Sequence, residues 1–191
     1  SLALLIAIVV TMVFSTILVR QIERDTQQHL LTNARVLDFS IARLKEEALA
    51  KAQWVASQPE IQSAMAKNDF DQLERLAKSY LNDQRLGFLL FVNPQGEVLL
   101  RAHALTQRED NVSSEQAVRG ALAGKSIVTI ESSPAEKFSI RAASPIGTDK
   151  RLGVVVAGFP LDNALVDNIK RITGLDMSIY EVDTVAATTL F

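Results

Sequence analysis

The chain opens on an uninterrupted run of apolar residues, with no charged side chain from Leu2 to Val19. As a helix this run is about 27 Å long, because each residue rises about 1.5 Å, and a bilayer core is about 30 Å thick. No pair of small residues that could mark a cleavage site follows Val19. We therefore expect residues 1–19 to form a transmembrane helix that is retained and not removed as a signal peptide.

Residues 20–57 contain neither Gly nor Pro, and their apolar positions recur at alternating spacings of four and three. This is the pattern by which one face of a helix meets a partner helix. We predict one long helix, the stalk, over residues 20–57, and a homodimer formed through this face. The alternative is that the face packs on the chain's own globular domain. The residues of this face are Leu30, Ala34, Leu37, Ile41, Leu44, Ala48 and Val55.

Two short helices are expected after the stalk. Ser57 and Glu60 have the spacing of a capping box around Pro59, and Asp69 with Gln72 repeats it more loosely. Each pair precedes a stretch with helical spacing of apolar residues. We therefore predict that a helix begins at each pair.

From Gly87 onward the apolar period changes to that of strands. Residues 87–93 and 97–102 are rich in β-forming side chains, and Pro94-Gln95-Gly96 between them is typical of a turn, so the pair predicts a hairpin. Further patterns predict a short helix at 113–122, strands at 126–131, 137–142 and 152–159, and a helix that Pro160 opens and Gly174 ends.

This order of elements indicates an α+β fold. The most economical arrangement is a five-stranded antiparallel sheet flanked by helices, which we expect to lie on one side of it. The predicted globular domain occupies residues 58–173. Residues 174–191 are left over at the end.

Composition and charge exclude several classes of protein. Lys and Arg (20) nearly balance Asp and Glu (22), and a net charge of −2 gives no general attraction to nucleic acid. Zero Cys excludes disulfides, cysteine nucleophiles and thiolate metal sites. No metal-spaced cluster or nucleophile motif is evident, and the segment from Gly120 to Ser126 is too short for a phosphate-binding loop. We expect no catalytic residue, metal or cofactor.

Several segments, taken in their order and spacing, resemble one protein family. They are SQPEIQSAMAKND, FLLFVNPQGEVLLRAHA, SEQAVRGALAGKS, FSIRAASPI and the segment that begins LGVVVAGFPLDNALVDNIKRITG. Together they resemble the Cache domain, the PAS-like extracytoplasmic sensor of bacterial chemoreceptors, sensor histidine kinases and diguanylate cyclases. The double-Cache type is the most similar, and the resemblance spans roughly residues 20–191.

This resemblance implies a function and a location. Residues 58–173 would be a Cache sensor domain in the periplasm or extracellular space, anchored in the inner membrane, and residues 174–191 would begin a second, truncated Cache module. The domain would bind a small metabolite and pass a conformational signal across the membrane. Two alternatives from the residues remain: a membrane-anchored coiled-coil adaptor without a ligand, and a tethered enzyme.

The candidate ligand site lies on two predicted strands. Arg101 and His103 share a face because they are two residues apart, and Arg141 shares a face with Ser139. If the two strands are neighbours in the sheet, their guanidinium groups can hold a small carboxylate by charge-assisted bonds. The chain lacks the Tyr-x-Asp run of amino-acid-binding Cache domains, so the resemblance favours a small organic acid. The alternative is that these arginines form surface ion pairs.

The register of the predicted hairpin decides which aromatic ring joins the site. Gly96 after Pro94 and Gln95 suits a type I turn with a bulge, which pairs Asn93 with Glu97 and puts Phe91 on the face of Arg101. A two-residue turn would put Phe88 there instead. We therefore include Phe91 among the expected ligand-binding residues, with plain core packing as its alternative role.

Overall fold

The computed structural model describes residues 36–107, 110–133, 137–147, 151–174, 176, 178–181 and 184–189. The expected transmembrane helix at residues 1–19 lies outside these residues. Among the residues that are described, no helix is long and apolar enough to cross a membrane. Residues Ile41–Phe191 form one structural unit, distinct from Ser1–Ser40.

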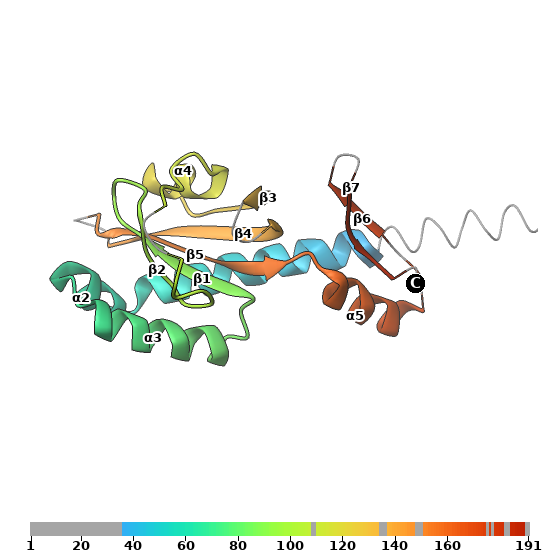
Figure 1. Ribbon diagram of the computed structural model, residues 1–191, viewed down its shortest axis with the longest axis horizontal. Helices are drawn as coiled ribbons and strands as arrows, with labels where there is room; N and C mark the ends of the chain where they lie inside the picture. The colour runs from blue at the N-terminus through green and yellow to red at the C-terminus, as the bar shows by residue number, and fades with distance from the viewer. Residues whose placement is uncertain are drawn as a thin grey trace, which may run out of the picture. The chain divides into compact units, whose positions relative to one another are not determined.

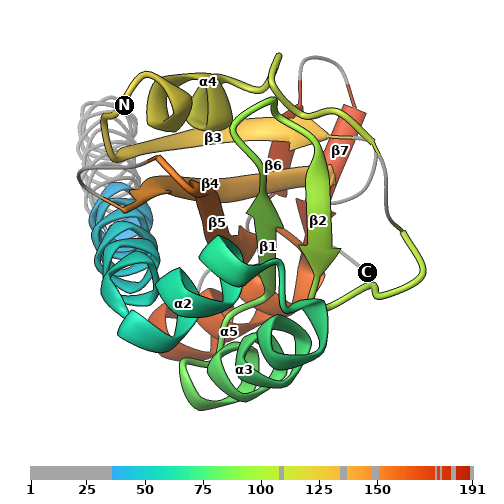
Figure 2. The same cartoon turned by 90° about the vertical axis from the view of Figure 1, so that its left-hand side faces the viewer.

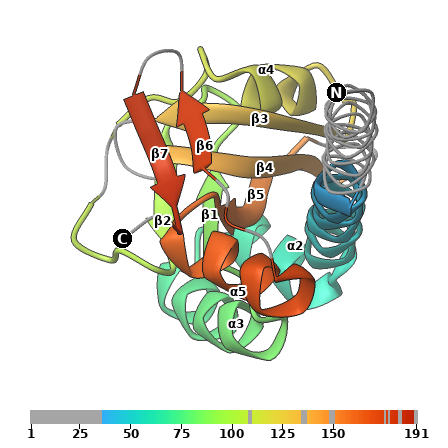
Figure 3. The same cartoon turned by 90° about the vertical axis from the view of Figure 1, so that its right-hand side faces the viewer.

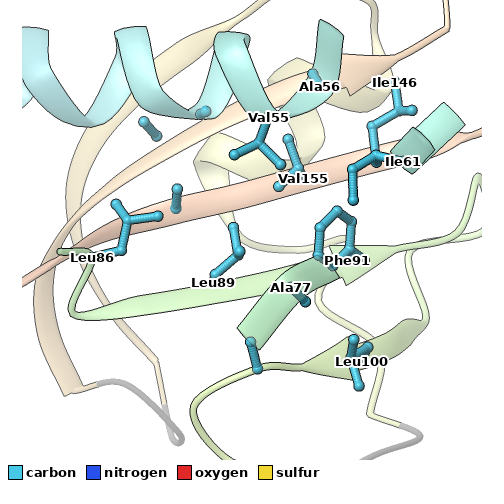
Figure 4. Packing of buried hydrophobic residues seen from close by; sticks show 14 of the residues in the cluster. Val55, Ala56, Ile61, Ala77, Leu86, Leu89, Phe91, Leu100, Ile146 and Val155 are labelled. Carbon is cyan, nitrogen blue, oxygen red and sulfur yellow. The ribbon is translucent and has the colours of Figure 1, made fainter. Parts of the chain in front are cut away.

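The predicted stalk is helical from residue 36, where the description begins, to residue 57. Its last turns pack on the chain's own sheet, because Ala48, Ala52 and Val55 are 0% exposed within the hydrophobic core. Figure 4 shows Val55 and Ala56 of this helix facing the side chains of the sheet. Over residues 41–57, the apolar face that we expected to meet a partner helix is therefore covered by the chain's own sheet. This is the alternative that the sequence left open.

Two short helices follow as predicted, although only one has the expected cap. Helix α3 (Phe70–Asp83) begins at Asp69, whose carboxylate accepts the N–H of Gln72 at 2.9 Å. Helix α2 (Pro59–Lys67) begins at Gln58 without a side-chain cap. The capping box predicted at Ser57 is wrong, because the Ser57 hydroxyl donates backward to the carbonyl of Trp54 at 2.7 Å.

The centre of the molecule is the predicted five-stranded antiparallel sheet, with strand order β2-β1-β5-β4-β3 (Figure 1). Its hairpin pairs β1 with β2 through the turn at Gly96, which has φ of +87°. The five strands are β1 (Phe88–Val92), β2 (Val98–Arg101), β3 (Ile127–Ser133), β4 (Lys137–Ile146) and β5 (Gly153–Pro160).

Helices cover both faces of this sheet, so the expectation of helices on one side only is wrong. Leu89 and Phe91 of β1 pack toward the helix over residues 41–57, α2 and α3, whereas Phe88 and Leu90 pack toward α4 (Gln116–Leu122). Figure 2 shows α4 beside β3 and β4, away from α2 and α3. The physical reason is that β1 is apolar at every position and fully buried, so both of its faces must be shielded from water.

The C-terminal part consists of α5 (Asn163–Thr173) and a separate hairpin of β6 (Ser178–Glu181) and β7 (Thr184–Thr188) (Figure 3). Helix α5 begins at Asp162, whose carboxylate accepts the N–H of Leu165 at 3.0 Å, and it ends at Gly174 as predicted. Pro160 closes β5 and does not open the helix.

Candidate ligand-binding site

A bulge in the β1–β2 hairpin sets the face on which Arg101 lies. Asn93 pairs with Glu97 as expected, with 2.9 Å between the Asn93 N–H nitrogen and the Glu97 carbonyl oxygen. Between the pairs Val92 with Val98 and Phe91 with Leu100, however, one extra residue of β2 shifts the register. Arg101 therefore stands opposite Leu90, on the sheet face covered by α4.

This register overturns the expected position of Phe91. Phe91 is 0% exposed and lies on the opposite face from Arg101, in the core with Leu89 and Leu100 (Figure 4). Phe88 takes its place on the face of Arg101. The ring on the face of Arg101 is thus that of Phe88, the alternative residue. A bulge within β2 brings it there, and not a two-residue turn.

Arg101 is buried in an ion pair with the loop that follows β2. Its side chain is 1% exposed, and its two terminal nitrogens lie 2.7 Å and 3.3 Å from the two carboxylate oxygens of Asp110. The Asp110 side chain is itself 52% exposed. The pair is a forked arrangement, in which a planar guanidinium faces a planar carboxylate.

Arg141 lies deeper in the same face of the sheet. Its side chain is 0% exposed and bonds Glu115, just before α4, at 2.7 Å between Nη1 and Oε2. The guanidinium carbon also stands 5.3 Å from the centre of the Phe88 ring. Strand β5 separates Arg141 from β1, and at that point it carries Gly158, which leaves room for the ring.

The condition that the strands of Arg101 and Arg141 be neighbours in the sheet is not met. β1 and β5 lie between β2 and β4 in the strand order. The Phe88 ring nevertheless connects the predicted residues, because its centre is 5.9 Å from the His103 ring on one side and close to Arg141 on the other. The polar residues therefore form one layer across the sheet without sitting on adjacent strands.

Glu131 ties this layer to α4. Its carboxylate accepts the backbone N–H groups of Gln116 at 2.9 Å and Ala117 at 3.1 Å, and the Thr129 hydroxyl at 2.8 Å. The first N–H groups of a helix have no partner within the helix, so a carboxylate placed there stabilises its start. Ser139, which is 0% exposed, faces Glu131 across the strand pair.

A cavity of about 470 Å³ opens at this end of α4, between the loop after β2 and strand β3. Its walls combine one guanidinium, three carboxylates and several hydroxyl groups. This size and polarity suit a small polar metabolite. The lining residues are Arg101, Asp110, Asn111, Val112, Ser114, Glu115, Glu131, Ser132 and Ser133.

Of the residues predicted for the site, Arg101 alone lines this cavity. Arg141, His103 and Ser139 lie in the polar layer behind it, and Phe91 lies on the far face of the sheet. The sequence interpretation missed the three carboxylates. For Asp110, the one signal that could have indicated a role is its place as an acidic residue shortly after a strand arginine.

The fold has a counterpart in known proteins. A family model described as the double sensory domain of two-component sensor kinases matches residues 24–191. No curated protein matches the chain.

Several solved structures share the fold. The sensor domain of E. coli DcuS is 23% identical, with a TM-score of 0.56 over 68% of this chain and 96% of that one. The sensor domain of the V. cholerae histidine kinase DctB is 13% identical, with a TM-score of 0.60 over 72% of this chain and 55% of that one. The sensory domain of the Campylobacter jejuni chemoreceptor Tlp3, solved with isoleucine bound, is 17% identical. Its TM-score is 0.54 over 85% of this chain and 68% of that one.

Proposed function

The chain belongs to the family of double sensory domains of two-component sensor kinases, and we propose that it is the extracytoplasmic ligand-sensing region of a bacterial membrane signal transducer. Residues 1–19 anchor it in the inner membrane. Its ligand is a small metabolite that carries a carboxylate group, and the ligand binds in the cavity between β3 and the loop after β2.

The observation that carries this proposal is the position of Arg101 in the wall of that cavity. A guanidinium that is 1% exposed is held in place by its surroundings and aims its donors in fixed directions. A carboxylate must recover the hydration that it loses on burial through charged donors, and each hydrogen bond to a charged group contributes about 1.5–3 kcal/mol. The ligand's carboxylate binds Arg101 in this proposal.

The polar layer behind the cavity has a supporting role. Arg141 is paired with Glu115 and is not part of the cavity wall, so it contributes by fixing Glu115 and the start of α4. His103 and Ser139 complete this layer and reach the ligand only through it. This assignment narrows the expected pair of arginines to one that meets the ligand and one that positions the wall.

Signalling requires that the ligand bind one arrangement of the domain better than another, since only that difference in affinity shifts the equilibrium. The cavity is formed by residues just before α4 and by β3, while the helix of residues 41–57 packs on the other face of the same sheet. A ligand that moves α4 against the sheet can therefore bias the helix that leads toward the membrane anchor.

The test is thermal unfolding of the full chain in lipid nanodiscs with a panel of small carboxylates, amines and sugars at equal ionic strength. A ligand at one hundred times its Kd stabilises the folded state by about 2.7 kcal/mol. We expect at least one carboxylate to raise Tm and the amines and sugars to leave it unchanged. Stabilisation by amines alone would contradict the ligand class, and no stabilisation by any compound would contradict ligand sensing.

A further inference from the structure

Arg101 stands in the wall of the cavity and is nevertheless almost completely covered. The carboxylate of Asp110 is one of the groups that cover it, and it accepts a hydrogen bond from each of the two terminal nitrogens of the guanidinium. Asp110 itself is 52% exposed. A carboxylate that enters the cavity can therefore form the same paired bonds with these two nitrogens only if Asp110 gives up its place.

Asp110 can leave without a rearrangement of the backbone. Its carbonyl accepts the N–H of Val98 at 3.0 Å, and the N–H of Val112 donates to the carbonyl of Gly96 at 2.8 Å. These main-chain bonds hold the segment against the hairpin independently of the Asp110 side chain. Rotation of that side chain alone thus frees the two terminal nitrogens of Arg101 from Asp110 and moves a half-exposed carboxylate toward water.

The second ion pair of the site does not have this freedom. Glu115 is 11% exposed, and its partner Arg141 is 0% exposed and lies against the Phe88 ring. Releasing either group would break a buried ion pair, which is strongly unfavourable. The exposure of the acidic partner therefore distinguishes the two ion pairs. The pair of Arg101 with Asp110 can exchange, and the pair of Arg141 with Glu115 stays in place.

Resting on the proposed function, we propose that Asp110 is a built-in competitor for the ligand's carboxylate, and that it sets the affinity and selectivity of the site. A tethered carboxylate meets Arg101 at a high effective concentration. Spherical anions such as chloride cannot match its two parallel hydrogen bonds and are rejected, whereas a planar carboxylate with further contacts to the cavity can replace it.

The experiment compares the full chain in nanodiscs with the Asp110→Asn variant, using acetate and succinate as probes and chloride at equal ionic strength as the reference. The matched control is Asp176→Asn, because Asp176 is also an ion-paired aspartate and is 51% exposed. Thermal unfolding as a function of probe concentration is the readout.

We expect Asp110→Asn to respond to succinate or acetate at concentrations at least about tenfold lower than the wild type needs, because the competitor no longer occupies most of the sites. The Asp176→Asn variant responds as the wild type does. Chloride has no effect on any of the three chains beyond its ionic strength.

Other outcomes overturn the proposal in distinguishable ways. Equal concentration dependence in Asp110→Asn and the wild type would show that Asp110 does not compete, while the proposed ligand class would stand. No response to either carboxylate in any chain would contradict the proposed function as well. If Asp110→Asn unfolds, carboxylate must restore its folding, since the proposal lets an external carboxylate take the place of Asp110; failure of that rescue would refute it.

Discussion

Arg101 and Arg141 look alike in the sequence, yet their surroundings give them different roles. Both are buried on the same face of the sheet, and each forms an ion pair: Arg101 with Asp110 and Arg141 with Glu115. Asp110 is 52% exposed, whereas Glu115 is only 11% exposed. Ligand exchange is therefore assigned to Arg101, and stability to Arg141.

Replacing Arg141 by Met should destabilise the chain strongly. The change leaves the Glu115 carboxylate without its guanidinium, and breaking a buried ion pair by removing one partner costs about 3–5 kcal/mol. Urea unfolding of the full chain in nanodiscs measures this loss.

The control for this variant is Lys78→Met, which removes the ion pair of Lys78 with Glu74. The side chain of Lys78 is 49% exposed and that of Glu74 is 29% exposed. Pairs exposed to this degree contribute about 0–1 kcal/mol. If Arg141→Met and Lys78→Met lower the free energy of unfolding equally, the buried pair does not hold the site together.

Among the strands, Gly158 of β5 is the point at which the sheet makes room for the polar layer. A Cβ at this position would lie 1.9 Å from the carbonyl oxygen of Ile140 and 2.6 Å from the Phe88 ring. Both are closer than real side chains come. The absence of a side chain there is what allows the ring to reach Arg141.

Gly158→Ala should therefore destabilise the chain and disturb the site together. Overpacking of a core typically costs about 1–3 kcal/mol. We expect a lower urea midpoint and changed NMR shifts of the Phe88 ring protons. A variant with wild-type stability and an unmoved Phe88 ring would contradict the close packing of β4, β5 and β1.

Asp176 connects the end of α5 with the β6–β7 hairpin. Hydrogen bonds from Lys170 and Thr189 hold the pKa of the Asp176 carboxyl below its ordinary value of 3.8. Because the folded pKa lies below the unfolded one, the contact stabilises the fold above the unfolded pKa. That contribution is lost as the pH falls through the folded pKa.

The Lys170→Met variant should raise the pKa of Asp176 toward 3.8, since it removes the principal donor. Carboxyl carbon NMR of Asp176 across acidic pH values measures the midpoint in both chains. A midpoint that does not differ between the wild type and the variant would show that Lys170 does not stabilise the carboxylate.

Much of this arrangement of elements could be predicted from the sequence, because it depends on local patterns. Apolar runs and turn residues predict the five strands, and Asp69 and Gly174 mark a helix start and a helix end. The extra residue in β2 could not be predicted, since its segment contains no glycine or other signal for a bulge. Because of that single residue, Phe88 lies on the sheet face of Arg101 where Phe91 was expected.

The roles of the acidic residues of the site could not be predicted from local sequence patterns either. Glu115 and Arg141 are 26 residues apart, and Glu131 caps a helix that begins 15 residues before it. Such pairs depend on how the α4 segment folds back over the sheet. The stalk pattern was ambiguous for a related reason, because the same apolar stripe serves a partner helix or the chain's own sheet.

For the molecule as a whole, these features combine into a sensor with two differently covered faces. One face of the sheet receives the helix that leads from the expected membrane anchor, and the other carries the polar layer and the cavity. A single sheet therefore stands between the proposed ligand and the proposed route of the signal. The central claim is that a small carboxylate binds in this cavity at Arg101.

Isothermal titration calorimetry of the full chain in nanodiscs, with the carboxylate that most raises Tm, tests this claim most directly. Arg101→Ala should weaken binding roughly 10- to 150-fold, because it removes one or more charge-assisted hydrogen bonds and about 1.4 kcal/mol corresponds to a tenfold change. Arg151→Ala, which removes an exposed arginine outside the cavity, should leave the Kd unchanged. If the folded Arg101→Ala variant binds the carboxylate as tightly as the wild type, the ligand does not bind at Arg101 and the account is contradicted.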